Sequence, residues 1–194
     1  MALGDHDKAI TDFTDVIHLD PTNVDAYDRR GFEFSKKGDL DKAITDYTEA
    51  IRIDPKDGWV YCDRGRVFRQ KGNLSQAIAD YTEAICLNPK NAQAYRDRGR
   101  ILVDKREQDK AIADYTEAIR LDPQLSGAYM DRGGVFADKG EQDKAIADYT
   151  EAIRLSPEFA EAYYLRGLGY QKMGEKSKAE NDFARAKKLG YKPK

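Results

Sequence analysis

One sequence pattern returns along almost the whole chain at an interval of 34 residues, and the stretch from Tyr95 to Pro123 shows it in full. A proline, a tyrosine and a glycine each recur on this count. The prolines are Pro21, Pro55, Pro89, Pro123 and Pro157, the tyrosines are Tyr27, Tyr61, Tyr95, Tyr129 and Tyr163, and the glycines are Gly31, Gly65, Gly99, Gly133 and Gly167. A fixed period of this length indicates one supersecondary unit stacked on copies of itself, because such a unit buries its apolar face only against its neighbours.

Each unit is predicted to hold two amphipathic helices joined by a tight turn. In the stretch from Tyr95, apolar and small residues fall at helical spacing on both sides of a polar break, which predicts helices over about 92–105 and 108–121. Asn91 is suited to cap the first helix, and Pro123 ends the second. The turn holds Arg106, for which we expect a strained conformation, whereas the other units have a glycine there: Gly38, Gly72, Gly140 and Gly174.

The period divides the chain into one continuous array. It consists of a half repeat that holds only a second helix, 1–22, followed by full repeats at 24–57, 58–91, 92–125, 126–159 and 160–194, which we number one to five. The last helix has a more polar surface than its equivalents, as a capping helix has.

These residues resemble the tetratricopeptide repeat family. Repeat two reads Tyr61-x2-Arg64-Gly65-x2-Phe68, then Ala77-x3-Tyr81, Ala84 and Pro89, against the family pattern W-x2-L-G-x2-Y, A-x3-F, A and P. The resemblance implies an all-α fold, a right-handed α-solenoid of stacked antiparallel helix pairs. It also implies a concave groove, lined by the first helix of each pair, that binds peptides or partner proteins.

One departure from the family pattern recurs in every full repeat, where an arginine replaces leucine: Arg30, Arg64, Arg98, Arg132 and Arg166. An aspartate on the same period precedes each core aromatic: Asp12, Asp46, Asp80, Asp114, Asp148 and Asp182. Because an unpaired charge near the core is costly, we expect an Arg–Asp pair in each repeat. The partner is the aspartate either of the same repeat, as in Arg98 with Asp114, or of the preceding one.

Charge and motifs argue against several classes of function. Lys and Arg number 33 against 35 Asp and Glu, so the net charge of −2 gives no general attraction to nucleic acid or to an anionic membrane. No apolar run is long enough for a membrane span, and the first residues lack a signal peptide, which predicts a cytoplasmic protein or one that has lost its leader. Cys62 and Cys86 form no ligand spacing, and His6 and His18 have no catalytic partner in the sequence. We therefore predict no enzyme activity, no metal and no cofactor.

Groove-facing positions of the first helices vary between repeats, and specificity is expected there. The predicted peptide-binding residues are Trp59, Arg66, Arg69, Arg96, Arg100, Met130, Tyr164 and Leu168. Arginines bind carboxylates in a bidentate fashion and a tryptophan anchors apolar groups, which predicts an acidic partner segment on repeats two and three and an apolar one on repeats four and five. In the alternative interpretation, the arginines pair with Asp63, Asp97 and Asp104 and only solvate the surface.

The half repeat suggests a different function. Ile10 and Phe13 would normally pack on a first helix that the sequence does not supply. Either the chain is a fragment of a longer array or it covers this face by self-association, forming a homo-oligomer or a structural spacer. Two hypotheses therefore remain from the sequence: a scaffold that binds a protein or peptide partner, and a self-assembling repeat array.

Overall fold

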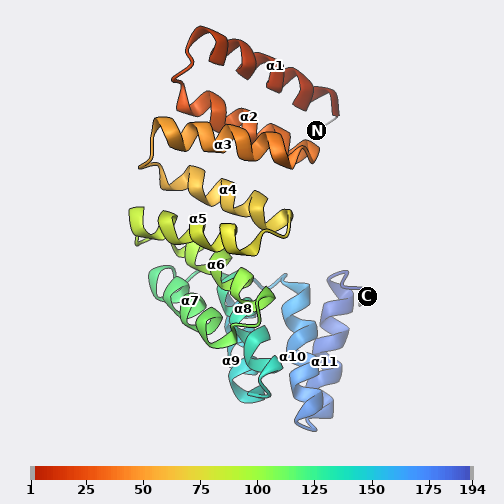
Figure 1. Cartoon of the computed structure of the whole chain (residues 1–194). Helices are drawn as coiled ribbons and strands as arrows, with labels where there is room; N and C mark the ends of the chain where they lie inside the picture. The colour runs from red at the N-terminus through yellow and green to blue at the C-terminus, as the bar shows by residue number, and fades with distance from the viewer. Residues whose placement is uncertain (1–2, 193–194) are drawn as a thin grey trace. The chain divides into compact units, whose positions relative to one another are not determined.

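A computed structural model describes residues 3–192, with side chains from residue 5, and within this range the secondary structure is entirely helical (Figure 1). The predicted all-α repeat fold is confirmed. The chain forms two compact units, unit 1 ending at Ile101 and unit 2 beginning at Leu102. The division falls inside one helix, and residues 1–2 and 193–194 of the predicted outer repeats lie outside the described residues.

Unit 1 is built from consecutive helices that pack on one another in chain order (Figure 1). Tight packing joins α2 to α3 and α4 to α5, and α1 packs on α2 as α3 packs on α4. The helices are α1 (Leu3–Leu19), α2 (Val24–Lys37), α3 (Leu40–Ile53), α4 (Gly58–Gln70), α5 (Leu74–Leu87) and most of α6 (Ala92–Asp104).

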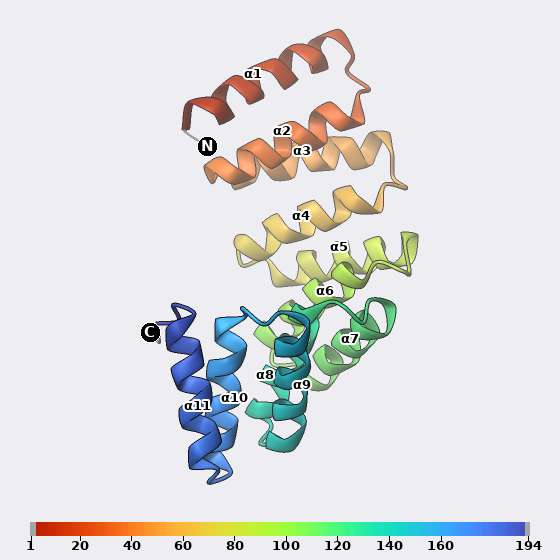
Figure 2. The same ribbon diagram turned by 180° about the vertical axis from the view of Figure 1, so that it is seen from behind.

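Unit 2 repeats this arrangement. Helix α8 packs on α7 and α9, and α10 packs on α9 and α11, which lies beside it in Figure 2. The helices are α7 (Gln108–Leu121), α8 (Ser126–Asp138), α9 (Gln142–Leu155), α10 (Ala160–Lys172) and α11 (Lys176–Lys188).

The helix ends follow from local chemistry. Asn91 caps α6 as predicted, because its side-chain oxygen accepts the Ala94 N–H at 3.1 Å. In the turns between paired helices Gly38, Gly72, Gly140 and Gly174 adopt positive φ. Arg106 occupies the same turn with φ of 62°, the one non-glycine with positive φ among the described residues. The strain expected at this turn is therefore present, because an L side chain is disfavoured in the left-handed region.

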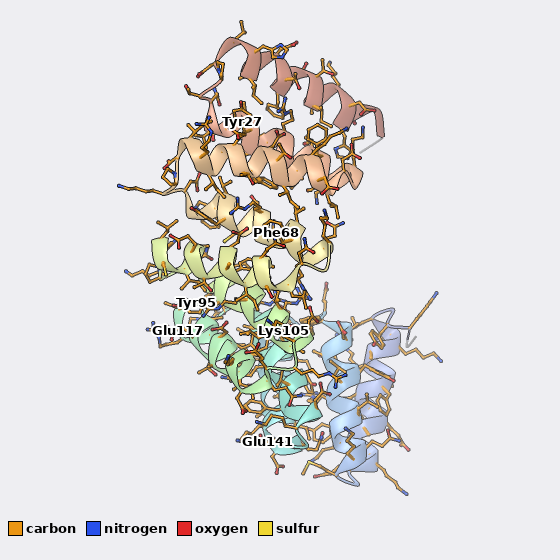
Figure 3. All side chains as sticks on the ribbon, in the orientation of Figure 1. Tyr27, Phe68, Tyr95, Lys105, Glu117 and Glu141 are labelled. Carbon is orange, nitrogen blue, oxygen red and sulfur yellow. The ribbon has the colours of Figure 1, made fainter. Side chains whose placement is uncertain are left out.

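The core of each repeat is a buried tyrosine against a glycine. Tyr47, Tyr81, Tyr115 and Tyr149 are each 1% exposed. A Cβ on Gly133 of α8 would lie 2.9 Å from the Tyr149 ring of α9. The absence of a side chain at Gly133 therefore lets α8 and α9 approach each other. Larger side chains close the repeat, and Figure 3 shows Phe68 on α4, where it packs against the cluster around Tyr81.

A charged ladder links successive repeats beside this core. Arg64 of α4 donates from Nε and Nη2 to both carboxylate oxygens of Asp80, at 2.9 and 2.8 Å. Its Nη1 donates to the Thr48 hydroxyl of the preceding repeat at 3.0 Å, and that hydroxyl donates to the Ile44 carbonyl at 2.7 Å. The arginine thus bridges two repeats through three hydrogen bonds.

The same ladder is present in other repeats. The bidentate pairs are Arg30–Asp46, Arg64–Asp80, Arg132–Asp148 and Arg166–Asp182. In these four the partner aspartate belongs to the same repeat, which decides between the two sequence alternatives, while the Arg98–Asp114 pair stays a prediction. The sequence interpretation missed the threonines, although they recur on the same period: Thr14, Thr48, Thr82, Thr116 and Thr150.

Candidate protein-interaction surface

Trp59 and Arg66 lie on α4 in unit 1. The Trp59 side chain is 65% exposed, and Asp57 fixes the start of its helix by accepting the Trp59 N–H at 2.9 Å. One Arg66 nitrogen, Nη1, donates to Asp63 Oδ1 at 2.5 Å one turn earlier. The pairing that the alternative interpretation expected therefore exists for Arg66, although its side chain is still 57% exposed.

Charged side chains of α4 and α6 act electrostatically on the Tyr81 hydroxyl. Asp97 of α6 and the Arg66 and Arg69 guanidinium groups of α4 all act on it, and burial raises the pKa of Tyr81 far above its usual value. Unit 1 thus brings two of the four predicted arginines into one neighbourhood. Arg96 and Arg100 lie half-buried on α6 in the same unit, and their role in binding stays a prediction.

Two side chains on the first helices of unit 1 have raised pKa values because they are buried. Cys62 is 7% exposed, and burial raises the pKa of its thiol to about 12, so it belongs to the core and is not reactive. Asp28 of α2 has a buried Oδ1 without a hydrogen-bond partner. Burial, with the nearby Asp63 and Asp57 carboxylates, raises the pKa of Asp28 to about 6. The sequence of one repeat does not reveal that Asp28 is buried or that other carboxylates lie near it.

The predicted apolar positions of unit 2 are only partly available. Met130 of α8 packs against the buried cluster of Ala152, Ile153 and Ala162, so it supports the core as well as the surface. Leu168 lies half-buried on α10. A Cβ on Gly134 would meet nothing within 4 Å, which leaves an open, featureless position on α8.

Tyr164 belongs to an aromatic pocket that the sequence did not predict. Its ring centroid lies 5.5 Å from that of Phe183 on α11 and 4.7 Å from that of Tyr191, which follows α11. These rings line a cavity of about 570 Å³ together with Ala186, Lys187, Gly190 and Lys192. The signal available in the sequence was Tyr191, which stands where the other repeats have proline.

The self-association candidates are partly covered. Ile10 and Phe13 are half-buried on α1, which packs on α2. Among the side chains of α1 from residue 5 on, the exposed large apolar ones are instead Val16, at 38%, and Leu19, at 88%. Self-association through α1 stays a prediction, with Leu19 as its most exposed apolar group.

Two further properties concern only the described part of the chain. No group of three or more His, Cys, Asp or Glu side chains there is arranged to hold a metal ion. No helix within residues 3–192 has the length and apolar character that crossing a membrane needs.

Family models identify the repeats. A model described as TPR repeat matches residues 31–68 and 133–174, and models described as tetratricopeptide repeat match residues 62–126 and 160–189. The chain belongs to the tetratricopeptide repeat family. No curated protein matches it in sequence.

Solved structures agree with this assignment. The chain is similar to MamA, with 30% sequence identity, a TM-score of 0.76 and coverage of 82% of this chain and 93% of that one. YrrB, described as a TPR protein with an unusual peptide-binding site, has 21% identity and a TM-score of 0.72, covering 92% of each chain. PilF of Pseudomonas aeruginosa has 20% identity and a TM-score of 0.81, covering 88% of this chain and 78% of that one. These last two, at lower identity, show the fold alone.

Proposed function

We propose that the chain is a protein-interaction scaffold that binds a partner segment on the exposed side chains of its first helices. The observation that carries this proposal is Trp59, a large aromatic side chain left 65% exposed on α4, about two helical turns before Arg66, whose side chain is 57% exposed. Tryptophan and arginine are the residues most enriched at the energetic centres of interfaces. Membership of the tetratricopeptide repeat family and the peptide-binding site in the description of YrrB support the same conclusion.

The chemistry of unit 1 favours an acidic partner segment. A guanidinium carries five N–H donors, and the contact of Arg66 with Asp63 uses one nitrogen, so a partner carboxylate can add to that contact without replacing it. Asp28 and Asp63 also lie close by, and they repel an acidic group that approaches from their side. The acidic segment is therefore expected to lie over Arg66 and Arg69, with an apolar group on Trp59.

A fluorescence titration tests this proposal, because Trp59 is the single tryptophan of the chain. Peptide pools of acidic-apolar and basic-apolar composition are titrated against wild type and against the double variant Arg66→Glu/Arg100→Glu. We expect saturable binding of the acidic pool that the double variant weakens by at least about tenfold. A double variant with wild-type affinity would contradict the assignment of the arginines, and no binding by any pool would contradict the proposed function.

Self-assembly is the second candidate, and the exposure of Leu19 favours it. Sedimentation of wild type over a range of concentrations would then show a rise in mass. Polar substitutions at Ile10 and Phe13 would abolish this rise, but both side chains are half-buried. Leu19→Asp is the cleaner variant because its side chain makes few contacts that the fold needs.

A further inference from the structure

We propose that the aromatic pocket of unit 2 binds one bulky apolar side chain of a partner segment that carries a carboxylate next to it. The pocket is formed by α10, α11 and the residues that follow α11. This inference rests on the proposed function, for which it names a second contact and its chemistry.

The lining of the pocket favours an apolar group. The Tyr164, Phe183 and Tyr191 rings form its walls, and Ala186 and Gly190 leave space between them. The volume of about 570 Å³ lies within the roughly 300–1,000 Å³ that is usual for ligand pockets. A Leu or Phe side chain that enters the pocket leaves water and packs against the three aromatic rings. This removal of apolar surface from water is the main favourable contribution to such contacts.

The charge at the rim favours an acidic neighbour. Lys187 and Lys192 line the pocket, and both are exposed. Helix α11 holds five cationic residues, Lys176, Lys178, Arg185, Lys187 and Lys188, against Glu180 and Asp182. The Asp182 carboxylate is already bound by Arg166, so the accessible charge of this helix is strongly positive.

Glu161 of α10 is the acidic group that acts on the pocket. Burial, followed by the Glu161 charge, raises the pKa of Tyr191, so Glu161 acts on the same ring from α10. A partner carboxylate is repelled by Glu161 and attracted by Lys187 and Lys192. Because the described residues hold no cluster suited to a metal ion, a metal does not explain the arrangement.

Four fluorescein-labelled hexapeptide pools test the inference by fluorescence polarisation. They differ only in their two central residues, which are Leu-Asp, Leu-Lys, Ser-Asp or Ser-Lys. We expect the Leu-Asp pool to bind most tightly. Tyr191→Ala should weaken it by at least about tenfold through loss of an aromatic wall, and Lys187→Glu by about fivefold, with the second effect smaller at high salt.

Lys188→Glu is the matched control, because it makes the same charge change on the neighbouring residue, which does not line the pocket. It should change the affinity by less than about twofold. Tyr191 follows α11, and its backbone N–H bond to the Ala186 carbonyl does not need the ring, so Tyr191→Ala should keep the wild-type unfolding temperature.

The outcomes separate the two proposals. Binding of the Leu-Asp pool that depends on Tyr191 and Lys187 supports the pocket. Suppose instead that Tyr191→Ala and Lys187→Glu leave the affinity unchanged, while Arg66→Glu/Arg100→Glu abolishes binding. This result overturns the pocket and leaves the proposed function standing. No binding by any pool overturns both. A concentration-dependent rise in mass that both Leu19→Asp and Tyr191→Ala abolish would place a second copy in the pocket, with Leu19 and the adjacent Asp20 as its occupant, and would overturn a separate partner.

Discussion

The two units share one packing scheme and present different chemistry. Unit 1 has an exposed tryptophan, exposed arginine charge and partly buried aspartates, whereas unit 2 has an open glycine position and an aromatic pocket with lysines at its rim. The Arg–Asp–Thr ladder is the same in both. The ladder is the part of the packing that both units share, and we propose that recognition depends on the few positions that the repeat leaves free to vary.

The largest effect is expected from the ladder, and it should be equal in the two units. Asp80→Ala and Asp148→Ala each leave a bidentate arginine unpaired in a site where the aspartate is 6% exposed. Each should lower the free energy of unfolding by about 3–5 kcal/mol, measured by urea denaturation. A loss below about 1 kcal/mol in either unit would contradict the structural role of the ladder.

The next effect is specific to unit 1 and depends on pH. The folded protein holds the pKa of Asp28 at about 6, above its ordinary value of 3.8, so folding takes up a proton between these values. The free energy of unfolding therefore falls as pH rises from about 4 to about 6. At pH 7.5 the Asp28 carboxyl is charged, so Asp28→Asn should raise the free energy of unfolding by about 1–2 kcal/mol, a figure reduced for solvent screening of this partly exposed group. At pH 4 the carboxyl is protonated in the folded protein, and the substitution should have little effect.

Asp25→Asn provides the control for this pH effect, since Asp25 is an exposed aspartate on the same helix. Thermal unfolding of both variants at the two pH values makes the comparison. Equal behaviour of the two variants would show that the burial of Asp28 has no energetic consequence.

The smallest effect separates the threonines of the ladder from ordinary helix threonines. The Thr48 hydroxyl accepts a hydrogen bond from Arg64, whereas the hydrogen bond of the Thr45 hydroxyl goes to the Asp41 carbonyl. Thr48→Val should cost about 1 kcal/mol more than Thr45→Val in urea denaturation, because it removes one acceptor from a charged donor. Equal losses of unfolding free energy in the two variants would mean that water replaces the Thr48 hydroxyl as the acceptor for the Arg64 guanidinium.

The sequence predicts the features that follow from local rules and fails for those that depend on how side chains of different elements pack. The Asn91 cap and the Arg–Asp pairs follow from local rules and from the cost of a buried charge. The raised pKa of Asp28 depends first on burial and then on the Asp63 carboxylate of the next repeat, and the pocket depends on the Tyr191 ring packing against Tyr164. Spacing alone does not give such contacts, because they depend on side-chain packing between elements.

Hydrogen exchange of the backbone amides with and without the acidic-apolar peptide pool tests the central claim most directly. If the first helices carry recognition, the pool should slow exchange in α4 and α6 and leave the paired helices α3 and α5 unchanged, since their outward side chains are not in contact with the peptide. Slower exchange confined to α3 and α5, or none at any amide under saturating peptide, would contradict the account.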